Sequence, residues 1–214
     1  MIRTEQEFEQ ITEPFAIHLA HGVLTDDRIR TLFATAPVDG YEPVKVTDPE
    51  HDKQYAMNLL YLQEHNEPRP AAAGLSPAWA ELLASLRSEE FVGWLERGTG
   101  LQLRELPTDI AIYTYRAGDF ISVHKDKPYK AITAILYLNP EWPADGGGAY
   151  EVRTSPDPAV PPVRRIPPTG GQLLAFPPSE TSWHSVSEVA AGVTQTRLTV
   201  QLEYWLVDNP KRRY

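Results

Sequence analysis

The chain has 214 residues, of which 42% are hydrophobic and 23% are charged, values typical of a globular protein that buries a substantial core. Its net charge of −9 argues against broad attraction to nucleic acid, and the absence of cysteine excludes disulfides, iron–sulfur clusters and thiolate metal sites. The polar N-terminus lacks the apolar run of a signal peptide, and no stretch approaches the ~20 apolar residues of a membrane span. We therefore expect a cytoplasmic protein with no nucleic-acid, membrane or obligatory protein partner.

The first half of the chain carries the signals of three helices. Thr25 is expected to cap a helix whose first turn is acidic. Ser76, followed by a proline, is expected to begin a second helix, and Ser88 a third helix that stops near Gly98. Between the first two, the segment 55–63 predicts a strand.

From residue 109 onward, short apolar stretches alternate with turns rich in Gly and Pro, which is typical of β-structure. The predicted strands are 109–116, 120–126, 131–138, 149–153, 163–166, 172–176, 182–189 and 196–206. This pattern predicts an α+β, mainly β fold, with a jelly-roll (double-stranded β-helix) core and N-terminal supporting helices. We interpret residues 1–214 as a single domain, with 1–105 as a helix-rich support and 106–214 as the jelly-roll core.

One predicted strand carries His124 and Asp126 two positions apart. Side chains at i and i+2 of a strand point to the same face, so the two groups are expected to lie together. A surface ion pair would explain this pattern, but a third donor, His184, follows on another predicted strand. Two histidines and one carboxylate with open positions form the facial triad that suits non-haem Fe(II).

The sequence around these residues resembles the prolyl-4-hydroxylase-like Fe(II)/2-oxoglutarate dioxygenases. The resemblance extends over about residues 15–206 and includes the helical segment that precedes the core. It is carried by Tyr115, Gly118, His124, Asp126, Tyr137-Leu138-Asn139, Trp142, Gly146 to Gly148, Pro167, Gly171, Phe176, His184-Ser185-Val186 and Arg197.

The resemblance implies a role for each matching residue. His124, Asp126 and His184 would hold the iron and form the catalytic centre. Arg197 would pair with the distal carboxylate of 2-oxoglutarate, a contact that suits the always-charged, bidentate guanidinium. Tyr137 would hydrogen-bond the same carboxylate, and Tyr115 would lie near the cosubstrate or the substrate.

The implied activity is that of a dioxygenase that uses Fe(II), 2-oxoglutarate and O2 to hydroxylate an aliphatic carbon. For the substrate we expect a small molecule, an amino acid or a metabolite derived from one. The alternatives are a prolyl residue in a protein or peptide and, in a different class, a cupin-like metal-binding protein without 2-oxoglutarate chemistry. The cupin alternative would explain the triad but not Arg197.

Lysines near the predicted metal site motivate the small-molecule expectation. Lys127 and Lys130 are expected to offer positive charge to a substrate carboxylate, whereas Lys125 alternates away from the ligand face. Lys130 also stands where family members often carry arginine, and this departure bears on the substrate rather than on the iron chemistry. Loops at 40–54, 64–75 and 140–148 are expected to close over a small ligand.

Overall fold

The computed structural model describes residues 1–206, and the description that follows concerns that part of the chain. Its helices are α1 (Asp26–Ala34), α2 (Pro77–Leu86), α3 (Glu89–Thr99) and the 3₁₀ helix η1 (Pro70–Gly74). Its strands are β1 (Phe8–Ile11), β2 (Ile17–Ala20), β3 (Glu42–Val46), β4 (Tyr55–Glu64), β5 (Glu67–Pro68), β6 (Thr108–Tyr115), β7 (Phe120–His124), β8 (Lys130–Tyr137), β9 (Tyr150–Val152), β10 (Arg164–Ile166), β11 (Leu173–Phe176), β12 (His184–Val186) and β13 (Arg197–Trp205).

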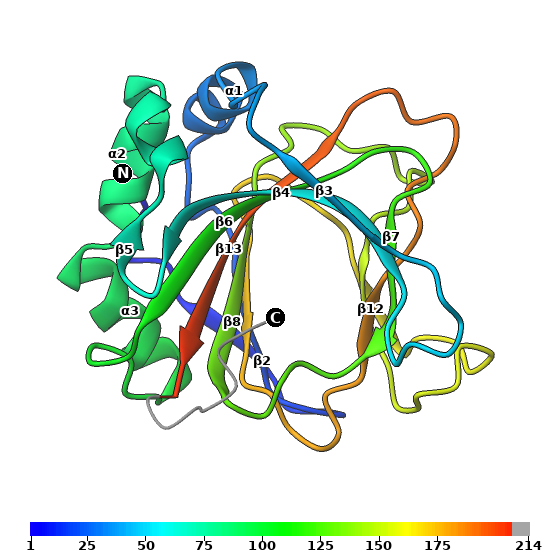
Figure 1. The fold of residues 1–214 in the computed structure, drawn as a ribbon. Helices are drawn as coiled ribbons and strands as arrows, with labels where there is room; N and C mark the ends of the chain where they lie inside the picture. Colours follow the sequence, from blue (N-terminus) through cyan, green and yellow to red (C-terminus); the bar gives the residue numbers. More distant parts are fainter. Residues whose placement is uncertain (207–214) are drawn as a thin grey trace.

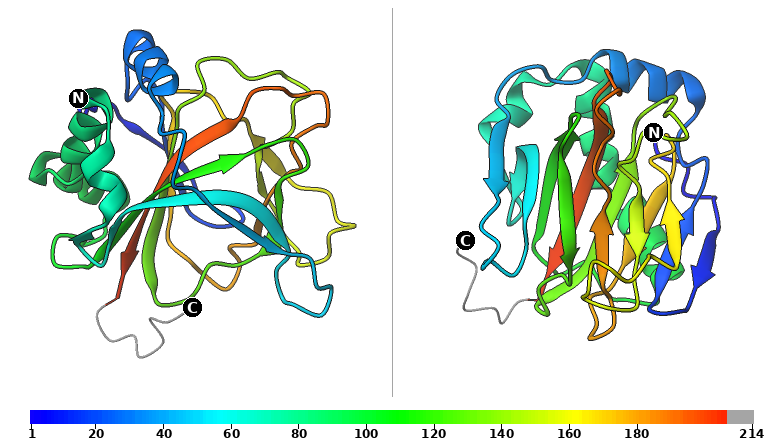
Figure 2. Two further views of the ribbon diagram at one scale, coloured as in Figure 1. Left: turned by 45° about the horizontal axis from the view of Figure 1, so that its top comes forward. Right: turned by 90° about the vertical axis from the view of Figure 1, so that its right-hand side faces the viewer.

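All strand pairs in this part of the chain are antiparallel and belong to one sheet, in the order β1-β2-β11-β8-β13-β6-β4-β7-β12-β9-β10. The short strands β3 and β5 pair with β4 outside this path. The sheet curls, so that β7 and β12 lie across from β8 and β13, with β4 running between the two sides (Figures 1 and 2). This mainly β, curled arrangement confirms the predicted jelly-roll fold class.

Helices α2 and α3 cover the outer face of the sheet beside β6 and β13 (Figure 1). Alternate side chains of β13, among them Leu198, Val200 and Leu202, are buried on this face in the same hydrophobic cluster as Trp79 of α2. The residues between them point to the inner, concave side, as the period of two in a strand requires. A charged or polar residue at an inward position of β13 therefore faces the space enclosed by the curled sheet.

The predicted helix starts are confirmed. The side chains of Thr25, Ser76 and Ser88 each accept a hydrogen bond from the backbone N–H three residues ahead. The third helix continues through Gly98 to Thr99 and is capped by Gly100 in the left-handed conformation. Gly98 has another role, because a Cβ atom at that position would overlap the ring of Phe8.

The first half of the chain contains more strand than its sequence pattern predicts. Strand β3 lies within the predicted loop 40–54, and β5 and η1 lie within the predicted loop 64–75. Strand β3 has only five residues, which include Pro43, and no fully buried side chain, and it forms by pairing with β4. No helix among residues 1–206 is long and apolar enough to cross a membrane.

Candidate metal centre

Two histidines lie opposite each other on neighbouring strands of the curled sheet. His124 ends β7 and pairs in register with His184, the first residue of β12, and their ring centroids are 4.2 Å apart. Each histidine follows a serine by two residues, and its Nδ1 lies within hydrogen-bonding distance of that serine's carbonyl oxygen, 2.9 Å for Ser122 and 2.8 Å for Ser182. A proton on Nδ1 donates to the carbonyl, so Nε2 of both rings is left as a metal ligand.

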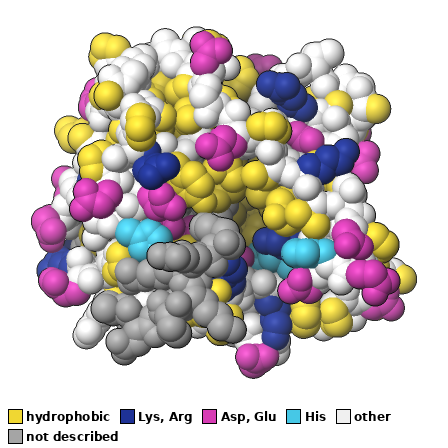
Figure 3. Space-filling model, viewed as in Figure 1, with side chains coloured by type: hydrophobic (Ala, Val, Ile, Leu, Met, Phe, Trp, Pro, Cys, Tyr) yellow, Lys and Arg dark blue, Asp and Glu magenta, His cyan; other side chains and the backbone are white. Residues whose placement is uncertain are grey.

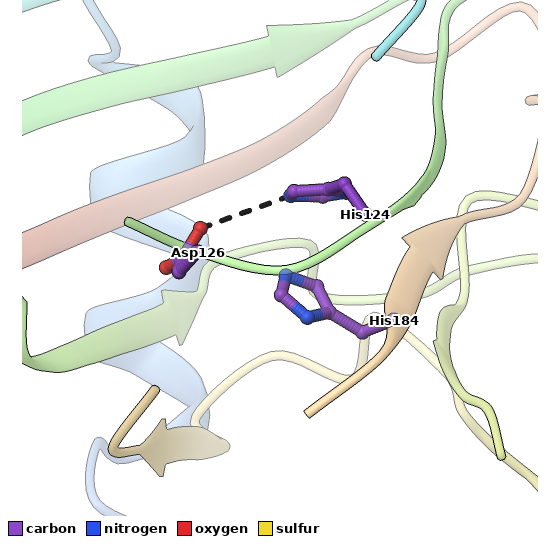
Figure 4. A group of neighbouring side chains, drawn as sticks. All are labelled: His124, Asp126 and His184. Carbon is purple, nitrogen blue, oxygen red and sulfur yellow. Dashed lines mark ion pairs between the residues drawn. The ribbon is translucent and has the colours of Figure 1, made fainter. Parts of the chain in front are cut away.

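Asp126 supplies the third donor from the segment that follows β7 (Figure 4). The strand ends at His124, so the predicted i and i+2 pair does not lie within one strand, yet its side chains still meet. Asp126 Oδ1 is 3.7 Å from His124 Nε2, and one ligand atom from each of His124, Asp126 and His184 lies within 4.8 Å of the other two. The structure thus brings together all three residues of the predicted triad.

Burial and neighbouring charges set the protonation states of the triad. Burial lowers the pKa of His184, and burial together with the adjacent His184 ring lowers the pKa of His124 well below its ordinary value. Both imidazoles are therefore neutral near pH 7. Burial alone would raise the pKa of Asp126, but the ammonium of Lys130, joined in acid by the protonated imidazoles of His184 and His124, outweighs it and holds that pKa well below its usual range. Two neutral imidazoles and an ionised carboxylate fit a divalent cation such as Fe(II).

A second group of residues surrounds the guanidinium of Arg197, the first residue of β13. This side chain is 1% exposed, and its Nε donates a 2.7 Å hydrogen bond to the carbonyl of Gly148. The guanidinium carbon lies 4.6 Å from the ring centroid of Tyr115 and 5.3 Å from that of Tyr137. The buried Tyr137 hydroxyl has no hydrogen-bond partner in residues 1–206. A buried cation beside an unpartnered hydroxyl fits the carboxylate of a bound acid.

Tyr150 lies between the two groups. Its ring stacks on His184 with centroids 5.1 Å apart, and its pKa is raised by burial first and then by the charge of Asp126 and the phenol of Tyr137. Its hydroxyl is likewise buried without a partner in the described chain. Tyr150 was not predicted as a site residue, because in the sequence an aromatic residue of a short strand cannot be distinguished from an ordinary core residue.

The polar side chains that support Asp126 were also not predicted from the sequence. Thr133 Oγ1 and Lys130 Nζ both donate to Asp126 Oδ2, at 2.6 Å and 3.2 Å, and Lys130 donates to Glu203 at 2.6 Å. The expectation that Lys130 faces a substrate is therefore wrong. The available signal was Glu203 at an inward-facing position of a strand that is buried along nearly its whole length, since a buried charge needs a partner.

The comparisons with known proteins agree with this geometry. Residues 110–205 match the family model described as the 2OG-Fe(II) oxygenase superfamily. The chain is 32% identical over 121 residues to "Prolyl 3-hydroxylase OGFOD1" of Mus musculus. The aligned segment covers 55% of this chain and 22% of the mouse protein. For the Xenopus laevis protein of the same name the identity is 34% over 104 residues, covering 47% and 20%. The chain thus spans about a fifth of the length of these curated relatives.

Solved structures share the fold at lower identity. A prolyl-4-hydroxylase from Pseudomonas putida aligns with a TM-score of 0.63 at 19% identity, covering 89% of this chain and 92% of that one. A prolyl 4-hydroxylase from Phytophthora capsici gives a TM-score of 0.60 at 18% identity, covering 89% and 59%.

The curled sheet and the His-Asp-His triad agree with the match of residues 110–205 to the 2OG-Fe(II) oxygenase superfamily. That superfamily uses Fe(II), 2-oxoglutarate and O2, and the part of the chain that matches it contains both the triad and Arg197.

Proposed function

We propose that the chain hydroxylates a prolyl residue of a protein or peptide. The observation that carries this proposal is the identity of 32% and 34% to two proteins named prolyl 3-hydroxylases, over segments that cover about half of this chain. The prolyl 4-hydroxylases among the solved structures supply the same fold but, at under 20% identity, no evidence on the substrate. The position on the proline ring is left to experiment.

The proposed iron ligands are His124, Asp126 and His184, through both Nε2 atoms and Asp126 Oδ1. The supporting observations are the engaged Nδ1 atoms and the orientation of Asp126, which turns Oδ2 toward other donors. Arg197 and Tyr137 are the proposed partners of the distal carboxylate of 2-oxoglutarate.

Bound iron, with 2-oxoglutarate and O2, supplies the oxidation that converts the 2-oxo acid to succinate and CO2 and adds one oxygen atom to a C–H bond. The protein's own residues bind, orient and exclude water. The two strands that carry His124 and His184 fix both ligands by direct pairing. The rings of Tyr150 and Phe176 pack against His184 and keep that side of the site dry.

The surface next to the site is compatible with a substrate that enters from outside. In the face shown in Figure 3 the molecule is hollowed near its centre, and hydrophobic side chains gather around the hollow, with basic and histidine side chains close to it. A prolyl ring is apolar, and the hydrophobic part of this lining suits it.

The lysines near the metal site give little support to a small, charged substrate, because their ammonium groups contact other residues of the protein. Lys130 is held between Asp126 and Glu203, and Lys125 pairs with Glu180 at 2.7 Å. Lys127 lies over the ring of Tyr129, with its Nζ 5.9 Å from the centroid. A free amino acid derivative is therefore the second candidate substrate, and none of these three lysines is a dedicated cation for it.

The test is succinate release in the presence of Fe(II), 2-oxoglutarate and O2, measured across two sets of candidates. One set contains proline-containing polypeptides, each paired with a copy in which alanine replaces proline. The other contains free amino acids, including free proline. We expect stimulation only by the proline-containing polypeptides, with one oxygen atom added to a proline in the product. Stimulation by free amino acids, and by no polypeptide, would overturn the proposal.

A further inference from the structure

A buried cluster of charged and polar side chains lies directly behind the metal-ligand carboxylate. It consists of Lys130, Thr133 and Glu203, and we call it the lysine cluster. Thr133 on β8 and Glu203 on β13 are opposite each other in the strand register, and both side chains point to the concave side of the sheet. The side chains of Lys130 and Glu203 are only 8% and 10% exposed. A buried ammonium at this place requires an explanation, because burial without good partners is costly.

We propose that Lys130 is a positioning residue for the metal ligand Asp126. Together with Thr133 it holds one carboxylate oxygen and leaves the other to coordinate the metal.

The hydrogen bonds divide the two oxygens of Asp126 between separate tasks. Oδ2 accepts from Thr133 Oγ1 at 2.6 Å and from Lys130 Nζ at 3.2 Å. Oδ1 faces His124 Nε2 at 3.7 Å, on the side of the other two ligands. Two donors on Oδ2 fix the rotation of the carboxylate. Asp126 would therefore bind the metal through Oδ1 alone and not through both oxygens. Partners of this kind orient a metal ligand and tune its affinity.

Glu203 holds the lysine from the opposite side. Lys130 Nζ donates to Glu203 Oε1 at 2.6 Å, and Gln201 Nε2 donates to the same oxygen at 2.7 Å. The ammonium also lies 5.3 Å from the ring centroid of Trp205. These contacts place the lysine between the two carboxylates of Asp126 and Glu203. They also leave it no freedom to reach a substrate.

A break in strand pairing produces this arrangement. The register between β8 and β13 shifts between Tyr204 and Trp205, so that Trp205 is opposite Lys130 instead of Ala131. Strict alternation from the inward-facing Thr133 would turn position 130 to the outer face, toward the helices. The irregularity turns the lysine inward instead, beside Asp126.

This inference rests on the metal site of the proposed function but not on the proposed substrate. Its test therefore measures metal binding and no turnover. Fe(II) affinity is measured under anaerobic conditions by competition with a coloured chelator, and the absorption band that Fe(II) and 2-oxoglutarate give together is recorded for the same samples.

The main variant is Lys130→Met combined with Glu203→Gln. The second substitution removes the charge that the first would leave buried and unpaired, and the new amide still accepts from Gln201. We expect the dissociation constant for Fe(II) to rise about 10- to 100-fold, the usual effect of removing an outer partner of a metal ligand. Lys130→Arg, which keeps a donor to Asp126, should recover part of the affinity. Thr133→Val removes the other donor to Oδ2 without stranding a charge, and should also weaken binding.

The matched control is Lys125→Met. Lys125 lies between the two ligands in sequence, but its ammonium pairs with Glu180 on the outside. It should leave the Fe(II) affinity unchanged. If the double variant and Thr133→Val both bind Fe(II) as the wild type does, Lys130 has no positioning role, although the metal site stands. If the wild type binds no Fe(II), the metal site and this inference both fail, whatever the turnover assay gives.

Discussion

Replacing Arg197 by methionine should remove the binding site for the distal carboxylate of 2-oxoglutarate. Arg197 is almost fully buried, and its guanidinium lies between the rings of Tyr115 and Tyr137. Loss of one partner from a buried, hydrogen-bonded charge pair costs about 2–5 kcal/mol. At about 1.4 kcal/mol per tenfold, the dissociation constant for 2-oxoglutarate should rise roughly 30- to 5,000-fold.

The assay is an anaerobic titration of the Fe(II)-loaded protein with 2-oxoglutarate. A parallel titration uses 2-oxovalerate, which has the 2-oxo acid group but lacks the distal carboxylate. The wild type should bind 2-oxovalerate about as weakly as the Arg197→Met variant binds 2-oxoglutarate, and the variant should no longer discriminate between the two acids. The control is Arg153→Met, which removes a half-buried arginine that binds Glu151 and Ser185, on the face of β12 opposite to His184.

The result that would refute this reasoning is specific. If Arg197→Met binds 2-oxoglutarate as tightly as the wild type, another cation binds the distal carboxylate. If the variant loses affinity equally for both acids, Arg197 supports the fold around the site but does not contact that carboxylate.

Two further predictions concern the scaffold. Gly147→Ala should destabilise the protein by more than Gly22→Ala. Both glycines have φ above +60°, but only at Gly147 would the added Cβ overlap the backbone of Glu188. Equal melting temperatures of the two variants would contradict this. Burial alone would raise the pKa of Glu151, but hydrogen bonds from Arg153 and other donors outweigh it and lower that pKa. The stability that Glu151 contributes is therefore complete above its unfolded-state pKa of ~4.3 and is lost as the pH falls through the lower folded-state value. In Glu151→Gln, the free energy of unfolding measured in urea should therefore depend less on pH over that acidic range. An unchanged pH profile would contradict the assignment.

The parts of the fold that depend on local chemistry could be predicted from the sequence. A serine or threonine cap acts within three residues, so the starts of α1, α2 and α3 can be predicted from the local sequence. Strands β6 to β13 are bounded by turn residues and carry apolar alternation. Strand β3 is different, since its residues are stable only in register with β4, a partner that the sequence of β3 does not specify.

The triad was predictable for a similar reason, and its support was not. His124 and Asp126 are close in sequence, and the spacing of the family pattern adds His184. The orientation of Asp126 depends on Lys130, Thr133 and their strand partners, which are brought together by a register shift between β8 and β13. Alternation along one strand cannot reveal an irregularity in its pairing, so the contacts of Lys130 with Asp126 and Glu203 could not be predicted. Lys130 was instead expected to offer its charge to a substrate, because it lies near the ligands in sequence.

The most direct test of the central claim is anaerobic titration of the wild type with Fe(II) and then with 2-oxoglutarate, followed by absorption. The His-Asp-His centre predicts one Fe(II) per chain and a metal-to-ligand charge-transfer band that appears only when both are present. His184→Ala should abolish the band, whereas His18→Ala, which removes a buried histidine of β2, should retain it. An unchanged band in His184→Ala, or no band in the wild type, would contradict the assignment of the metal centre.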